Sequence, residues 1–123
     1  MTTQMINAGP GAQAPKDAKR VYRWADLPPR TDAATFVVDP DGADPRRITV
    51  SKRMRQVLEG LMRHPIYAAS YCRIGDRVLP LRRDHGLEIV CTMYENDPET
   101  GRERYGVYEL KTKVRRAVQK VAA

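Results

Sequence analysis

One amphipathic segment, residues 51–63, constrains the fold more than any other part of this chain of 123 residues. Its apolar residues recur at intervals of three and four and therefore form a single stripe along a helix. The stripe consists of Val50, Met54, Val57, Leu58, Leu61 and Met62. Ser51 is a suitable N-cap, and Pro65 prevents the helix from continuing past His64. The polar side of the expected helix carries Lys52, Arg53, Arg55 and Arg63.

The residues that follow predict two more helices. Residues 66–72 are long enough for two helical turns, and we expect a short helix there. Ile74, Val78 and Leu81 then recur at i, i+4 and i+7, which predicts a third helix. Gly86 suits the left-handed position that ends such a helix. Pro80 leaves two alternatives open: the third helix either starts near Leu79 or is kinked.

Two hairpins are expected on either side of these helices. Apolar and polar residues alternate over 87–94, and a second β-rich run at 105–110 follows a stretch of turn residues, which predicts a long antiparallel hairpin. Residues 35–38 and 47–50 are also β-rich, and the turn-forming sequence DPDGADPR separates them. They predict a shorter hairpin.

The two ends of the chain complete the expected organisation. Residues 1–20 lack a periodic apolar pattern and predict a flexible N-terminal arm, and 21–47 form an irregular extension that contains the short hairpin. Residues 48–110 are the compact domain, and 111–123 predict a basic C-terminal helix. The apolar residues of that helix would be Val114, Ala117, Val118 and Val121.

The order helix, short helix, helix and hairpin over residues 48–110 resembles the winged helix-turn-helix family of DNA-binding domains. The sequence LRRDHGLEI at 81–89 carries much of the resemblance, with a core Leu, a basic pair and a Gly that closes the helix before the wing opens. The sequence RYGVYEL at 104–110 is similar to the second wing strand of small phage and prophage domains of this kind. The implied fold is α+β, with a three-helix core, an antiparallel wing and, here, an extra C-terminal helix.

The charge pattern indicates an acidic partner. The chain carries 22 Lys and Arg against 15 Asp and Glu, a formal charge of +7. Residues 51–86 hold eight basic and three acidic residues, and 111–123 hold five basic residues and no acidic one. Residues 87–110 are acidic, with six carboxylates against two arginines. The basic clusters favour nucleic acid, and the acidic wing weakens that interpretation because phosphate would repel it.

The resemblance implies a binding surface for double-stranded DNA. A third helix in the major groove would bring arginines to guanine edges, and other cations would contact phosphates. The residues closest to the bases would be Arg73, Arg77, Arg82 and Arg83. The residues on phosphates would be Lys52, Arg53, Tyr67, Lys111, Lys113, Arg115 and Arg116.

We therefore expect a sequence-specific or architectural DNA-binding protein, acting as a transcriptional regulator or a phage-type accessory factor. The alternative is a protein-interaction module without catalytic activity on the same winged-helix fold. In that case the acidic wing or the C-terminal helix would bind a partner protein or a second copy of the chain, which would form a homodimer.

No enzyme, metal or cofactor is expected. The four potential zinc ligands Cys72, Cys91, His64 and His85 lack the paired spacing of a zinc site. The sequence Glu-Leu-Lys at 109–111 matches half of a nuclease signature, but Asp97 would lie roughly 23 Å from Glu109 along the expected hairpin. No apolar run reaches the length of a secretory signal or a membrane span, so we expect a cytoplasmic protein that does not contact the membrane.

Overall fold

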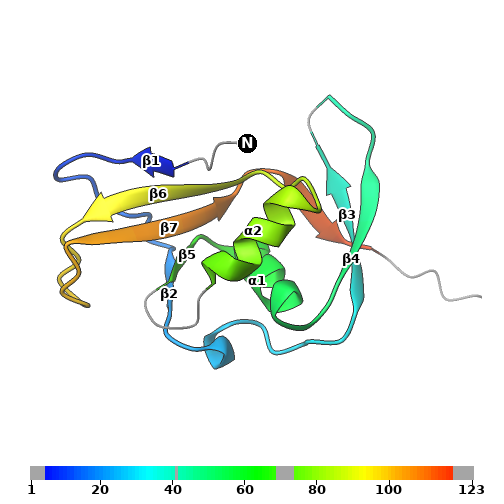
Figure 1. Cartoon of the computed structure of the whole chain (residues 1–123), viewed down its shortest axis with the longest axis horizontal. Helices are drawn as coiled ribbons and strands as arrows, with labels where there is room; N and C mark the ends of the chain where they lie inside the picture. The colour runs from blue at the N-terminus through cyan, green and yellow to red at the C-terminus, as the bar shows by residue number, and fades with distance from the viewer. Residues whose placement is uncertain (1–4, 41, 69–73, 118–123) are drawn as a thin grey trace, which may run out of the picture.

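The computed structural model describes residues 5–40, 42–68 and 74–117, which form two β-sheets with two α-helices between them (Figure 1). In chain order the elements are β1 (Met5–Asn7), β2 (Lys19–Val21), the 3₁₀ helix η1 (Trp24–Asp26), β3 (Ala34–Asp39), β4 (Arg46–Val50), α1 (Lys52–Arg63), β5 (Ile66–Ala68), α2 (Gly75–Arg83), β6 (Ile89–Glu95), β7 (Arg104–Leu110) and β8 (Lys113–Arg116).

The expected winged helix-turn-helix fold is wrong. The described residues contain two α-helices, α1 and α2, so no three-helix core is present among them. The fold is α+β. One sheet has five strands in the order β1-β6-β7-β5-β2, and the other has three antiparallel strands in the order β4-β3-β8. The hairpin that the resemblance interpreted as a wing is the centre of the larger sheet.

Several local predictions are confirmed. Both hairpins form, since β3 pairs with β4 and β6 pairs with β7 in antiparallel registers. Helix α1 occupies the segment that the apolar stripe predicts, and α2 is followed by Gly86 with a φ of 66°. A start of the third helix near Leu79 is wrong, because α2 begins at Gly75 and continues through Pro80.

Two expected helices are strands. In the first segment, 66–72, Ile66–Ala68 forms β5, which pairs with β7 on one side and β2 on the other. Residues 69–73 lie outside the described residues. The C-terminal helix is also wrong: Lys113–Arg116 forms β8, which pairs with β3. The sequence KVRR is too short for its pattern to distinguish a strand from a helix, and backbone pairing with β3 makes it a strand.

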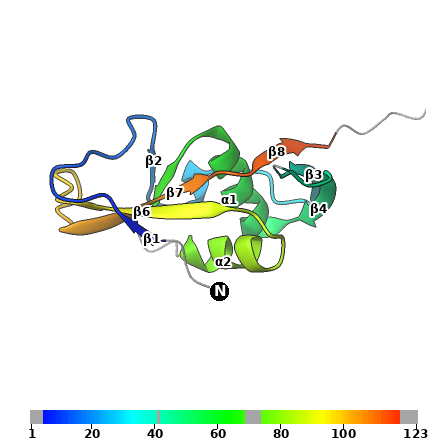
Figure 2. The same ribbon diagram turned by 90° about the horizontal axis from the view of Figure 1, so that it is seen from above.

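The core covers both faces of the five-stranded sheet. Helices α1 and α2 pack with the sheets around Phe36, Leu58 and Ile89, all at most 1% exposed. On the opposite face, Tyr67, Tyr94, Tyr105 and Val107 form a second cluster. Its cover is a set of four alanines between β1 and β2: Ala8, Ala12, Ala14 and Ala18. Figure 2 shows α2 on one side of β6 and the chain between β1 and β2 on the other. Residues 1–20, expected as an arm, thus contribute two strands and part of a core.

Candidate nucleic-acid interface

The three described arginines among the four expected near DNA bases do not form one surface. Arg73 lies outside the described residues. Arg77 and Arg83 are exposed on α2, and Arg83 forms an ion pair of 3.2 Å with the adjacent Asp84. Arg82 is half-buried, and its Nε donates a hydrogen bond of 2.7 Å to the carbonyl oxygen of Ile89. Its guanidinium therefore faces the body of the protein instead of a groove of DNA.

The residues expected on phosphates also divide. Lys52 and Arg53 are exposed at the start of α1, and the guanidinium of Arg53 lies 4.9 Å from the centre of the Trp24 ring. Tyr67 is 2% exposed, so its hydroxyl is not available to a phosphate. Lys111 forms an ion pair of 3.0 Å with Glu109. The remaining three, Lys113, Arg115 and Arg116, are the exposed cations of β8.

Strand β8 builds one basic surface together with β3 and β4. Val37 of β3 lies opposite Arg47 on one side and Arg115 on the other, so all three side chains are on the same face of the three-stranded sheet. Lys113, two residues before Arg115, is on that face too. The opposite face carries Phe36 and is buried in the core. We call Arg47, Lys113 and Arg115 the basic sheet face; its strands are at the right of Figure 1.

The basic sheet face is open to an external anion. Each of its three cations is exposed, and within the part of the chain that the structure describes none forms an ion pair or a side-chain hydrogen bond. Adjacent strands lie 4.7–4.9 Å apart, so the backbones of Arg47 and Arg115 are about 10 Å from each other across β3. Asp39 lies opposite Lys113 at one corner and reduces the local charge there.

Arg47 is the member of this surface that sequence reasoning missed. The alternation of β4 does place Arg47 and Thr49 on the face away from Ile48, and that signal is visible in the sequence. What the sequence does not reveal is that β8 pairs with the other edge of β3 and brings Arg115 level with Arg47.

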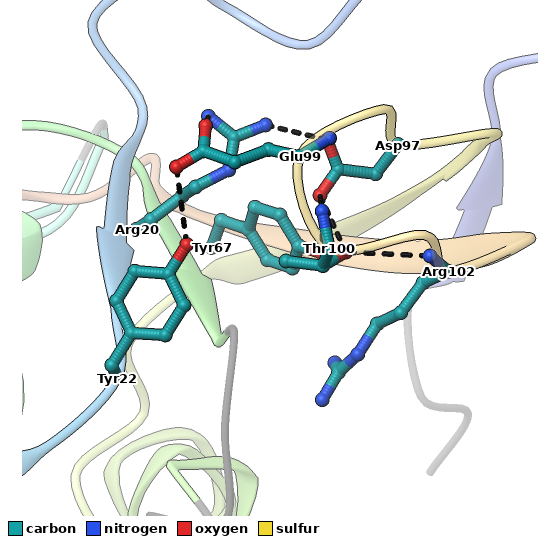
Figure 3. A network of polar contacts seen from close by, with 7 residues as sticks. All are labelled: Arg20, Tyr22, Tyr67, Asp97, Glu99, Thr100 and Arg102. Carbon is teal, nitrogen blue, oxygen red and sulfur yellow. Dashed lines mark hydrogen bonds and ion pairs between the residues drawn. The ribbon is translucent and has the colours of Figure 1, made fainter.

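A second polar arrangement surrounds Asp97 at the tip of the β6–β7 hairpin (Figure 3). The carboxylate accepts hydrogen bonds from Arg20 at 2.6 Å, from Tyr67 at 2.9 Å and from the Thr100 hydroxyl at 2.6 Å. Arg20 also forms an ion pair of 3.0 Å with Glu99. These contacts fasten the hairpin tip to β2 and β5, two strands far away in the sequence.

The environment of Asp97 keeps its carboxyl ionised. Burial acts to raise the pKa, but hydrogen bonds from Thr100, Arg20 and Tyr67 outweigh that effect and hold the pKa of Asp97 well below its usual range. Its hydrogen bonds join three separate segments of the chain, at Arg20, Tyr67 and Thr100, which is typical of a structural anchor. Asp97 thus belongs to the stability of the fold and does not join the basic sheet face.

Metal binding and membrane insertion find no support in the described residues. No group of three or more His, Cys, Asp and Glu side chains among them is arranged to hold a metal ion. None of the helices within the described ranges is long and apolar enough to cross a membrane.

Comparisons with protein-family models, with curated proteins and with solved structures found no match. The resemblance to winged helix-turn-helix domains therefore has neither a family match nor the fold to support it.

Proposed function

We propose that this protein binds nucleic acid, with double-stranded DNA as its partner, through the basic sheet face. The observation that carries the proposal is the alignment of Arg47 and Arg115 on either side of Val37, with Lys113 beside them. None of these three cations forms an ion pair with another described residue. Duplex DNA carries about one negative charge per 1.7 Å of its axis, so a cationic surface of about 10 Å faces several phosphates at once.

The proposed contacts are with phosphates and not with bases. Three cations on a sheet surface neutralise charge without reading sequence, and their effect on affinity depends strongly on salt. Antiparallel strands are a known way of presenting side chains to DNA. The acidic residues of the chain support this choice of surface, because the acidic tip of the β6–β7 hairpin belongs to the other sheet (Figure 1).

Fluorescence anisotropy on a random duplex of about 20 base pairs tests the proposal. The test variant combines Arg47→Gln, Lys113→Gln and Arg115→Gln. If all three contact phosphates, the slope of log affinity against log salt should become less steep by about 2.7, at about 0.9 per contact. The wild-type protein should bind at 50 mM salt and lose affinity steeply by 200 mM.

A control variant removes the same charge elsewhere. Lys16→Gln, Arg63→Gln and Arg77→Gln change three exposed cations outside the basic sheet face, one of them on α2. This variant should keep most of the wild-type affinity and slope. Equal losses in the two triple variants would show that binding reflects net charge alone, and no binding of the wild-type protein at 50 mM salt would exclude the function.

A further inference from the structure

A cavity of about 420 Å³ lies between α2 and the five-stranded sheet. Helix α2 supplies Gly75, Leu79 and Arg82 to its wall, and strands β6 and β7 supply Cys91 and Tyr108. The volume falls within the range of about 300–1,000 Å³ that is usual for small-molecule sites. The cavity belongs to the face of the sheet that α2 covers and involves none of the residues of the basic sheet face.

Two glycines keep this space open. A Cβ atom at Gly75 would lie 3.0 Å from the Tyr108 hydroxyl oxygen, and one at Gly106 would lie 2.8 Å from the sulfur of Cys91. A larger residue at Gly106 would force the Cys91 sulfur to shift, and one at Gly75 would crowd the Tyr108 hydroxyl. Gly75 has an ordinary helical backbone at the start of α2, so its lack of a side chain matters for space and not for conformation.

The polar groups of the wall are a cation and hydrogen-bond donors. Among the described residues, the Arg82 side chain forms one hydrogen bond, from Nε to the carbonyl of Ile89, and its buried Nη2 has no acceptor there. No carboxylate among the described residues forms an ion pair with it. Burial raises the pKa of the Tyr108 hydroxyl and of the Cys91 thiol, so both are neutral donors near pH 7.

The apolar part of the wall surrounds these groups. Val78, Leu79 and Met93 line the cavity, and Leu79 is 49% exposed. A guanidinium that has no ion-pair partner among the described residues, in a wall that also carries these apolar side chains, is complementary to a ligand with an acidic head and an apolar body.

We propose that this cavity binds a small organic carboxylate, with its carboxylate against Arg82 and Tyr108 and its hydrocarbon part along Val78, Leu79 and Met93. The carboxylate supplies a counter-charge to Arg82, which lines the cavity and has no ion-pair partner among the described residues. The hydrocarbon covers apolar surface that is otherwise in contact with water. This site is independent of DNA binding, because it uses a different sheet and different residues.

A titration followed by amide NMR tests the site with three probes of equal chain length: octanoate, octanol and octyltrimethylammonium, all below their micelle concentrations. Octanoate should cause saturable shifts confined to amides around the cavity, such as those of Gly75, Arg82 and Gly106. Octanol should bind more weakly at the same amides. The cationic probe should bind weakest, because Arg82 repels it.

Three variants distinguish binding of the ligand's carboxylate from binding of its hydrocarbon chain. Arg82→Gln should weaken octanoate binding about tenfold and leave octanol nearly unchanged, since a charge-assisted hydrogen bond is lost. Gly75→Ala should weaken both probes, because its methyl group meets the Tyr108 hydroxyl. Arg83→Gln changes the next residue of α2, which is exposed and outside the cavity, and should bind octanoate as the wild type does.

Three results would overturn the proposal. The first is the absence of saturable shifts at the cavity. The second is octanoate binding that Arg83→Gln weakens as much as Arg82→Gln. The third is binding that Gly75→Ala leaves intact, which would place the ligand elsewhere even if Arg82→Gln failed to fold. Loss of DNA binding in the triple variant of the basic sheet face would affect none of these measurements.

Discussion

At the scale of single residues, some polar side chains that the sequence predicted to be exposed are buried and bind other residues of the protein. Arg55 lies on the side of α1 expected to be polar, yet it is 2% exposed and donates hydrogen bonds to the carbonyl and the carboxylate of Asp32. Tyr67, expected at a phosphate, donates to Asp97. The helix that carries Arg55 was predicted correctly, whereas Tyr67 lies on a strand and not on the expected helix. In both cases the polar group binds a partner distant in sequence.

Asp97 offers the clearest test at this scale. Replacing it with Ala should lower the free energy of unfolding by about 3 kcal/mol, because Arg20 and Tyr67 lose their shared acceptor in a buried site. Urea unfolding measures the change. Glu99→Ala removes an exposed partner of the same arginine and should cost less than about 1 kcal/mol. Equal costs would contradict the anchoring role of Asp97.

The same carboxyl predicts a pH dependence. Its pKa is lower in the folded protein than in the unfolded chain, where an aspartate has a pKa of about 3.9. Below about pH 5 the unfolded chain therefore binds more protons than the folded one, and stability falls as the pH falls. Unfolding midpoints from pH 6 to pH 3 should decrease less steeply in Asp97→Asn than in the wild type. Parallel curves would show that Asp97 is not perturbed.

At the scale of elements, short-range sequence patterns predicted helices and hairpins, whereas the pairing of strands far apart in the chain could not be predicted. The apolar stripe of 51–63, the two hairpins and the glycine after the third helix are all recognisable in the sequence, because each depends on neighbours within a few residues. β5 and β8 were missed because each is short and its burial depends on a strand far along the chain. The basic sheet face was therefore only partly predictable: its β8 residues were expected as cations, but not their alignment with Arg47.

Strand β8 can be tested with a pair of substitutions that remove the same charge. The amide of Ala117 donates to the carbonyl of Thr35, and the alternation of an antiparallel ladder then directs the amide of Arg115 toward β3 and that of Arg116 toward the open edge. Arg115→Pro should cost about 2 kcal/mol because it removes a ladder donor, whereas Arg116→Pro should cost clearly less. Thermal unfolding compares them, and a C-terminal helix would make the two losses equal.

At the scale of the whole molecule, the N-terminal residues are a structural part of the body. They add β1 beside β6 and β2 beside β5, both in parallel, and the alanines between these strands cover the tyrosine cluster. Their composition gives little hint of this, because alanine and glycine form no stripe of their own. The cluster they cover is separate from the main core around Phe36, Leu58 and Ile89.

A charge placed within that segment tests its packing. Ala14 is half-buried and packs against the tyrosine cluster, while the neighbouring Gln13 is exposed. Ala14→Asp should lower the free energy of unfolding by about 1–2 kcal/mol, because it brings an unpaired carboxylate to an apolar surface. Gln13→Asp adds the same charge and should change it by less than about 0.5 kcal/mol. Identical results in denaturant titrations would mean that residues 8–18 are not packed on the sheet.

The parallel pairing of β1 with β6 has a consequence for the order of folding. Met5 lies opposite Cys91, and Lys19 lies opposite Ile66, so the first strands of the chain find their partners only in its second half. During synthesis, β1 cannot pair with β6 until the β6–β7 hairpin has left the ribosome. Such distant contacts slow folding. The tyrosine cluster can therefore form only after β6 and β7 have been made, although the alanines that cover it precede it in the chain.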